Sequence, residues 1–381
     1  MNRLKAVFAF AGILFFAQGI FGQEPVRTKH YEIVSGTEQL GQQMETLFEV
    51  YNRVFMFDPE EAALPLRVRV FSGTDEYNDY ARSMSAVVSP GAMYLHYVQS
   101  GRRELILDGS NADNSLPYQA FIQYLRAFVA QPPYWMQKGF AEFFRALSFT
   151  ADGVLDYEEN LSWLQPVRKM KSRPKIEGIL TAESGGVIAN SDEFAGLACS
   201  LVSFFLNSGK EEYTRSFTDS IMTLSNENSS SVNAASVMKR LLLGRDSSQM
   251  SLDYERYINS RKTFSELVSE GQKAYSSGDS AGAKLSFLAA LELKSSHHVP
   301  YYYLGLLAYN ADKYDEAREN YLAAIENGAE KALVFYALGI NAAAAKKIQE
   351  AVDYLRRSGE EDPKQYKEKT DKIRQQLTSW N

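Results

Sequence analysis

The chain has little of the chemistry on which disulfides and most metal sites depend. Its 381 residues include one cysteine, Cys199, so an intrachain disulfide and a thiolate metal cage are both excluded. It contains four histidines, at positions 30, 96, 297 and 298. Because imidazole is the usual metal ligand and proton-transfer group near neutral pH, this scarcity limits both kinds of chemistry.

A surplus of positive charge is also absent. Lys and Arg number 41 against 47 Asp and Glu, which gives a formal net charge of −6. Proteins that bind nucleic acids usually carry a surplus of Lys and Arg that neutralises the phosphates. We therefore expect no nucleic-acid partner. Hydrophobic residues make up 45% and charged residues 23%, as in ordinary folded proteins, and the length predicts two or three domains.

The N-terminus has the pattern of a secretory signal peptide. Arg3 and Lys5 precede an apolar run from Ala6 to Phe21, and Gly22 follows it. We expect a signal over residues 1–22 and an exported protein, periplasmic or in the cell envelope. The run is shorter than the ~20 residues that span a bilayer, and an uncleaved N-terminal anchor is the alternative. No cysteine lies near the cleavage point, so the protein is not expected to be a lipoprotein; peripheral envelope association is left open.

A 34-residue register marks the C-terminal part of the chain. The repeated positions are a glycine (Gly271, Gly305, Gly339), an alanine twelve residues later (Ala283, Ala317, Ala351) and a large apolar residue four further on (Phe287, Tyr321, Leu355). This register resembles the tetratricopeptide repeat, a helix–turn–helix unit in which small residues lie where two helices touch. The resemblance implies an all-α superhelix over 264–380, with repeats 264–297, 298–331 and 332–363 and a capping helix.

Between the signal and the repeats, the hydrophobic pattern changes from strands to helices. Strands are predicted over 30–34 and 66–71, as two strands within 86–97, and over 104–107. Helices are predicted over 37–55, 118–130, 135–148, 194–207, 211–225 and 231–243. The order predicts an α+β domain over 23–262 rather than alternating βαβ units.

The most informative stretch runs from Pro133 to Phe144 and reads Pro-Tyr-Trp-Met-Gln-Lys-Gly-Phe-Ala-Glu-Phe-Phe. It resembles the PxWLNEGxAEYF helix of gluzincin metallopeptidases, whose first Glu binds zinc. In that family an upstream HExxH helix supplies two histidine ligands and the glutamate that activates water. We therefore identify 23–262 as resembling a peptidase MA-like domain, a family that is often exported and sometimes joined to such repeats.

The resemblance also implies that the zinc chemistry has been lost. Gln119 and Gln123 stand at the histidine positions, Ala120 at the general base and Lys138 at the glutamate ligand. Amide oxygens are poor zinc ligands, and an ammonium would repel the ion. We expect no zinc, no other cofactor and no peptide cleavage. If the three side chains converge, Lys138 is expected to donate hydrogen bonds to both glutamines.

No other catalytic group stands out. Cys199 lies in an apolar segment and is expected to be a buried small residue, while His297 and His298 are expected to be solvated in a loop between repeats. No GxSxG motif is present. A divergent hydrolase that uses the same cleft without zinc is kept as one alternative, and a structural subunit of an envelope complex as another.

The repeats offer a second candidate site. The concave groove of such arrays, which binds peptides or partner helices, is lined by the first helix of each pair. Its predicted lining residues are Gln272, Tyr275, Tyr302, Leu306, Tyr309, Asn310, Tyr336 and Ile340. A row of tyrosines gives a large amphipathic contact area at low entropic cost, although the rings could instead pack on one another. The sequence thus predicts a non-catalytic scaffold that binds a protein or peptide partner through this groove.

Overall fold

The structure is a computed structural model that describes residues 24–85, 87–97, 103–111, 115–150, 153–157, 159–186 and 193–378. The predicted signal peptide lies outside the described residues. The chain divides into two compact units, with the boundary between Arg261 and Lys262. Within the ranges given, none of the helices combines the length and the apolar character needed to cross a membrane.

The first unit is built on a five-stranded sheet with the order β1-β2-β3-β5-β4. Its strands are β1 (Val26–Arg27), β2 (Tyr31–Val34), β3 (Leu66–Phe71), β4 (Ala92–Leu95) and β5 (Glu104–Asp108). The central strands β2, β3 and β5 are parallel, and β1 and β4 pair antiparallel at the two edges. Parallel neighbours need a crossover, which α1 (Glu38–Phe55) and α2 (Thr74–Met84) supply. The expectation of a layout without βαβ units is therefore wrong.

Among the described residues of 86–97, only one strand forms where two were expected. The residues from 87 to 91 make a turn, because Pro90 has no N–H to donate and Gly91 has a positive φ of 75°. The Gly91 carbonyl accepts a hydrogen bond from Asp108 N at 2.8 Å, and this contact starts the pairing of β4 with β5.

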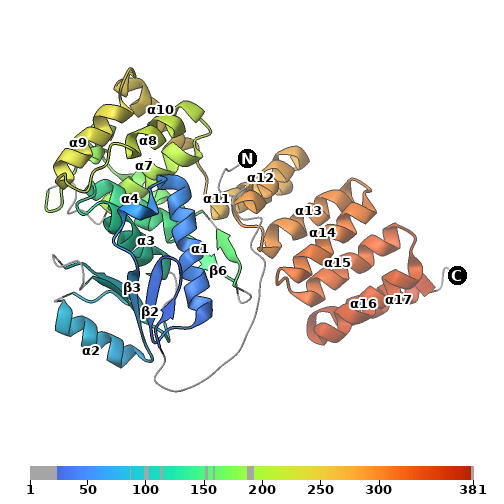
Figure 1. Ribbon diagram of the computed structural model, residues 1–381. Coiled ribbons are helices and arrows are strands. Elements are labelled where there is room, and N and C mark those ends of the chain that lie inside the picture. The colour runs from blue at the N-terminus through green and yellow to red at the C-terminus, as the bar shows by residue number, and fades with distance from the viewer. Residues whose placement is uncertain are drawn as a thin grey trace. The chain divides into compact units, whose positions relative to one another are not determined.

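The two faces of the sheet are covered by different helices (Figure 1). Tyr77 and Ala81 of α2 pack with Leu95 and Ile106 on one face. Side chains alternate along a strand, so Leu105 points to the opposite face, where α1 and α3 (Ser115–Phe128) lie. Tyr94 is paired with Leu105 across the ladder and therefore shares that second face.

A bundle of helices completes the first unit. Its members are α3, α4 (Tyr134–Phe144), α5 (Leu164–Lys169), α6 (Ile176–Leu180), α7 (Phe194–Asn207), α8 (Glu211–Ile221), α9 (Ser230–Leu241) and α10 (Ser247–Ser260). The helix expected over 135–148 ends at Phe144, because Leu147 pairs with Tyr157 in a hairpin of β6 (Leu147–Phe149) and β7 (Leu155–Tyr157). Helix α4 packs closely on α7: a Cβ added to Gly139 would lie 2.5 Å from the carbonyl oxygen of Ala198.

The second unit folds as helical hairpins that follow the 34-residue register, closed by a capping helix. The helices are α11 (Phe264–Ser276), α12 (Ser280–Leu293), α13 (His298–Asn310), α14 (Tyr314–Glu326), α15 (Lys331–Ala344), α16 (Ile348–Glu361) and α17 (Pro363–Thr378). The repeated glycines have the role that the register predicts. A Cβ at Gly305 would lie 2.5 Å from the ring of Tyr321, and a Cβ at Gly339 would lie 2.6 Å from Leu355. The small residue of the first helix thus makes room for the large residue of the second.

Ion pairs repeat with the same register along the second helices of the hairpins. Lys284 of α12 pairs with Glu316 of α14 at 3.2 Å, and Arg318 of α14 pairs with Glu350 of α16 at 3.1 Å. These exposed pairs add little stability each, but they occupy equivalent positions in successive repeats.

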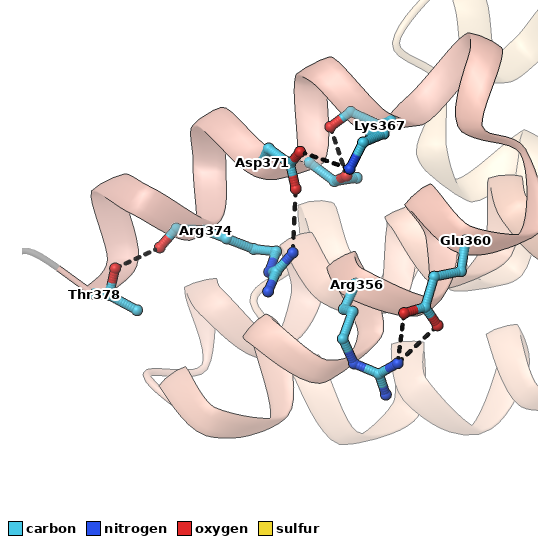
Figure 2. Close-up of polar contacts among 7 residues, drawn as sticks. Arg356, Glu360, Lys367, Asp371, Arg374 and Thr378 are labelled. Carbon is cyan, nitrogen blue, oxygen red and sulfur yellow. Dashed lines mark hydrogen bonds and ion pairs between the residues drawn. The ribbon is translucent and has the colours of Figure 1, made fainter.

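Helix α17 closes the array with an exposed polar face and a narrow buried face. Figure 2 shows Lys367 and Arg374 both paired with Asp371, at 3.2 and 3.1 Å, on the polar face. The buried residues of the helix are Tyr366 and Thr370. A helix that is polar on its outer side is what the end of a repeat array requires for solubility.

Candidate functional site

The helices α3 and α4, which carry the peptidase-like motif, pack against each other through aromatic rings. The ring of Phe121 lies 5.7 Å from that of Phe140 and 5.0 Å from that of Phe144. Both helices belong to the main core of the first unit, so their polar residues are held in fixed positions.

The four residues that the resemblance aligned with a zinc site have separate local roles. Gln119 Oε1 accepts a hydrogen bond from Tyr94 N at 3.1 Å, and the buried Gln123 donates from Nε2 to the carbonyl of Arg67 at 2.8 Å. Ala120 is fully buried. Lys138 Nζ lies 5.9 Å from the centre of the Tyr134 ring.

The hydrogen bonds expected between Lys138 and the two glutamines are not formed. The oxygen of Gln119 is used by the edge strand β4, whose Tyr94 N–H points away from β5 and needs an acceptor. The oxygen of Gln123 is buried and has no hydrogen-bond partner in the described part of the chain. Both glutamines thus attach α3 to the sheet rather than to Lys138.

The polar groups near the motif are arranged for structure rather than for catalysis. Glu142 pairs with Arg145 at 2.9 Å, and the guanidinium of Arg145 lies 4.2 Å from the centre of the Tyr118 ring. Burial, together with Glu142 and against the effect of Arg145, raises the pKa of Tyr118 to about 12. Burial raises the pKa of the Cys199 thiol well above its usual value, so the thiol stays protonated and is a poor nucleophile.

The histidines of the repeat unit are structural. His297 is the N-cap of α13 and accepts a hydrogen bond from Val299 N at its Nδ1, 3.3 Å away. Its ring stacks on His298 at 4.9 Å and lies 4.7 Å from Phe264. The expectation that both residues lie solvated in a loop is wrong, because His297 caps α13, His298 is its first residue and both are half-buried. Over the described ranges, no three His, Cys, Asp or Glu side chains gather in a metal-binding arrangement.

The predicted groove residues lie on the first helices of three successive hairpins. Helix α11 carries Gln272 and Tyr275, α13 carries Tyr302, Leu306, Tyr309 and Asn310, and α15 carries Tyr336 and Ile340. Asn310 is exposed and the other seven are half-buried, and none of the eight is charged. Asn310 Nδ2 donates to the hydroxyl of Tyr275 at 3.3 Å, which links the first repeat to the second.

The groove tyrosines also touch the core of the array. The ring of Tyr302 lies 5.9 Å from that of the buried Tyr321, and Tyr336 lies 5.6 Å from Tyr366 of the capping helix. Burial, with added effects of Tyr366, Tyr303 and Tyr275, raises the pKa of Tyr302. Its hydroxyl therefore stays protonated and able to donate a hydrogen bond.

The sequence did not single out several residues that help to form these sites. Tyr303 stacks on Phe287 at 4.9 Å and so belongs to the repeat core. Tyr366 could have been found as the aromatic residue in an otherwise polar capping segment. Arg126 lies seven residues after Gln119, a spacing that places both on one face of α3.

No protein-family model matches this chain, and no curated protein matches it. Two solved structures are among those to which this chain is similar. One is described as "YrrB: a TPR protein with an unusual peptide-binding site", with 16% identity and a TM-score of 0.28 over 54% of this chain and 94% of that chain. The other is the "MamA RS-1 ArsTM double mutant", with 20% identity and a TM-score of 0.26 over 33% of this chain and 72% of that chain. At such low scores, the tetratricopeptide assignment rests on the register and the helix packing described above.

Proposed function

We propose that this protein is an exported, non-catalytic interaction scaffold. In this proposal a gluzincin-like unit that has lost its zinc ligands is joined to an array of repeats that binds a protein or peptide partner. The apolar N-terminal run after Arg3 and Lys5 supports export. The replacement of the metal ligands by Gln119, Gln123 and Lys138 supports a role without zinc-dependent hydrolysis.

The observation that carries the proposal is the row of half-buried tyrosines on consecutive first helices. Tyr275, Tyr302, Tyr309 and Tyr336 each expose part of a ring while the rest packs on the array. Rings held in this way lose little conformational entropy when a partner covers them, and their hydroxyls can bond to a peptide backbone. We infer that the partner lies along α11, α13 and α15.

Neighbouring tyrosines on α13 allow a matched test. Tyr301 donates its hydroxyl to the carbonyl of Ser295 at 3.1 Å and is not a groove position, whereas Tyr302 is one. Peptides would be selected from a random library on the intact chain, and the affinity of the best one measured for each variant. Tyr302→Phe should weaken binding several-fold and Tyr301→Phe should leave it unchanged. Tyr309→Ala, which removes a whole ring, should cost about 2 kcal/mol, roughly thirtyfold in affinity.

The phenylalanine substitutions keep the ring contacts, including that of Tyr302 with Tyr321, so a loss of affinity cannot be ascribed to unfolding. Circular dichroism of each variant would check this directly. Equal affinities for the wild type, Tyr302→Phe and Tyr309→Ala would show that recognition does not use the groove.

A further inference from the structure

One arginine of the first unit has no negative partner although it is partly buried. Arg126 lies near the end of α3 and donates from Nε to Gln137 Oε1 at 2.8 Å and from one terminal nitrogen to the carbonyl of Ala130 at 3.0 Å. Both acceptors are neutral, and Arg126 forms no ion pair with any residue that the structure describes. The guanidinium therefore keeps N–H donors and a full positive charge for another group.

Other partly buried arginines of the same unit do have carboxylate partners. Arg69 pairs with Glu104 at 3.1 Å, Arg173 with Glu255 and Arg261 with Glu159. Pairing is the general rule, because taking a cation out of water without a counter-ion costs several kcal/mol. Arg126 differs from these three, because the acceptors described for it are neutral.

A second guanidinium and an imidazole lie beside Arg126. His96 and Arg103 continue the β4–β5 ladder just beyond its last pair, and the side-chain alternation places them on the same face as Tyr94, towards α3. Arg103 donates from Nε to the Tyr97 carbonyl at 2.8 Å, and the Tyr94 hydroxyl lies 3.5 Å from His96 Nδ1.

The electrostatics agree with this geometry. Burial and the guanidiniums of Arg126 and Arg103 lower the pKa of His96 to about 4. Burial and Arg103 lower the pKa of Arg126, although Tyr94 acts in the opposite direction. Two guanidiniums thus repel each other, and they keep the neighbouring imidazole uncharged. A bound anion would relieve this repulsion.

We propose that Tyr94, His96, Arg103 and Arg126 form a binding site for an oxyanion, the carboxylate or phosphate group of a ligand. The planar guanidinium of Arg126 suits such groups because it offers parallel N–H donors to two oxygens. Lys138, which follows Gln137 on α4 and forms no ion pair with the described residues, adds a further cation on that helix. The site belongs to the first unit and does not depend on the function proposed for the repeats.

Thermal unfolding of the intact chain in different salts tests the site. Sodium citrate and sodium phosphate would be titrated against sodium chloride at equal ionic strength. We expect a saturable rise of several degrees in Tm with at least one of the two oxyanions, since a ligand that binds only the folded state stabilises it. A rise with citrate alone would identify a site for carboxylates, and a rise with phosphate alone would identify a site for phosphates. If neither salt gives a saturable rise in Tm, the proposal is wrong.

A pair of substitutions separates this site from general salt effects. Arg126→Met removes the unpaired charge, and Arg215→Met removes the charge of an exposed arginine of α8. The first variant should bind the anion at least tenfold more weakly and the second should respond as the wild type does. An unchanged response of Arg126→Met would sink the proposal.

A third measurement covers the case in which Arg126→Met does not fold. The titration of His96 can be followed by NMR in the wild type, with and without the anion. Because the anion offsets the two guanidiniums, the pKa of His96 should rise from about 4 towards its usual value. A pKa that stays constant at saturating anion would contradict the assignment.

Discussion

A single hydrogen atom at position 139 allows α4 to lie against α7. Gly139 has the carbonyl oxygen of Ala198 at 2.5 Å from where a Cβ would stand, and Val202 at 3.1 Å. The glycine of the Trp-x-x-x-Gly-x-Ala-Glu motif therefore has a packing role that does not depend on metal chemistry.

Substitution of this glycine should destabilise the first unit. Gly139→Ala should lower the free energy of unfolding by about 1–2 kcal/mol, because overpacking outweighs the ~1 kcal/mol by which alanine favours a helix. Gly196→Ala in α7 is the control, since its Cβ would meet only ordinary contacts at 3.5 Å or more. Urea denaturation should show a lower free energy of unfolding for Gly139→Ala and an unchanged one for Gly196→Ala.

Asp253 of α10 predicts a pH dependence. Its carboxylate, 6% exposed, pairs with Lys210 at 2.6 Å and accepts from the Tyr213 hydroxyl at 2.6 Å. Burial raises its pKa, but the hydrogen bonds from Lys210, Tyr213 and Gln249 outweigh burial and bring the pKa to about 2. The folded state thus holds this group ionised at a pH where the unfolded chain is protonated.

The stabilisation from Asp253 should be complete above about pH 5 and lost as the pH falls through about 2. Asp253→Asn should cost ~1–2 kcal/mol at pH 7, and the difference from the wild type should disappear only below about pH 2. The exposed Asp219, paired with Arg240 at 3.4 Å, gives the control Asp219→Asn, which should change stability by less than ~0.5 kcal/mol. Equal losses for both variants at pH 7 would show that burial of the carboxylate has no special effect.

At the scale of elements, the capping helix α17 is held by few contacts. Tyr366 packs on Tyr336 and is 5% exposed, and Thr370 lies against Gly359. Tyr366→Ala should cost about 2 kcal/mol, and the loss should appear first as faster amide exchange in α17 and α16. Lys369→Ala, on the exposed side, should leave exchange unchanged. Slower or unchanged exchange after Tyr366→Ala would contradict this role of the ring.

The repeat helices could be predicted from the sequence because the register is local. Each glycine meets its large partner sixteen residues later, within one hairpin, so no distant part of the chain decides the outcome. Helix α2 was missed because its buried residues are only Tyr77 and Ala81, too few to give a helical stripe. The predicted end of α4 was wrong because Leu147 pairs with Tyr157 in a hairpin, and the local hydrophobic pattern does not show this pairing.

The two candidate sites also differ in how far the sequence predicts them. The groove residues follow from the register, since equivalent positions of a repeat face the same side. The proposed oxyanion site could not be predicted, because Tyr94 lies in β4, Arg103 just before β5 and Arg126 in α3, and only the folded sheet brings them together. The resemblance suggested Gln119 as a replaced ligand, but its hydrogen bond with Tyr94 N depends on the edge strand, which the sequence did not show.

For the whole molecule, the two compact units should unfold in separable steps. Trp135 and Trp163 are both buried in the first unit, and residues 262–378 contain no tryptophan. With Trp380 replaced by phenylalanine, fluorescence reports only the first unit, while circular dichroism at 222 nm reports the helices of both. The two denaturation curves should not coincide. Superimposable curves would show that the chain unfolds as one cooperative body.

The ion pairs along the second helices make the length of the array adjustable. Lys284 and Arg318 are 34 residues apart, and so are their partners Glu316 and Glu350. A duplicate of residues 298–331 placed after residue 331 would offer its own Glu316 to Arg318 and its own glycine to its own tyrosine. The one new join would place equivalent residues of the repeat at the interface, with Arg318 opposite the duplicated Glu316 as it is now opposite Glu350. The groove would gain another pair of tyrosines. The repeat is in this sense modular, and the number of copies in the chain sets the length of the groove.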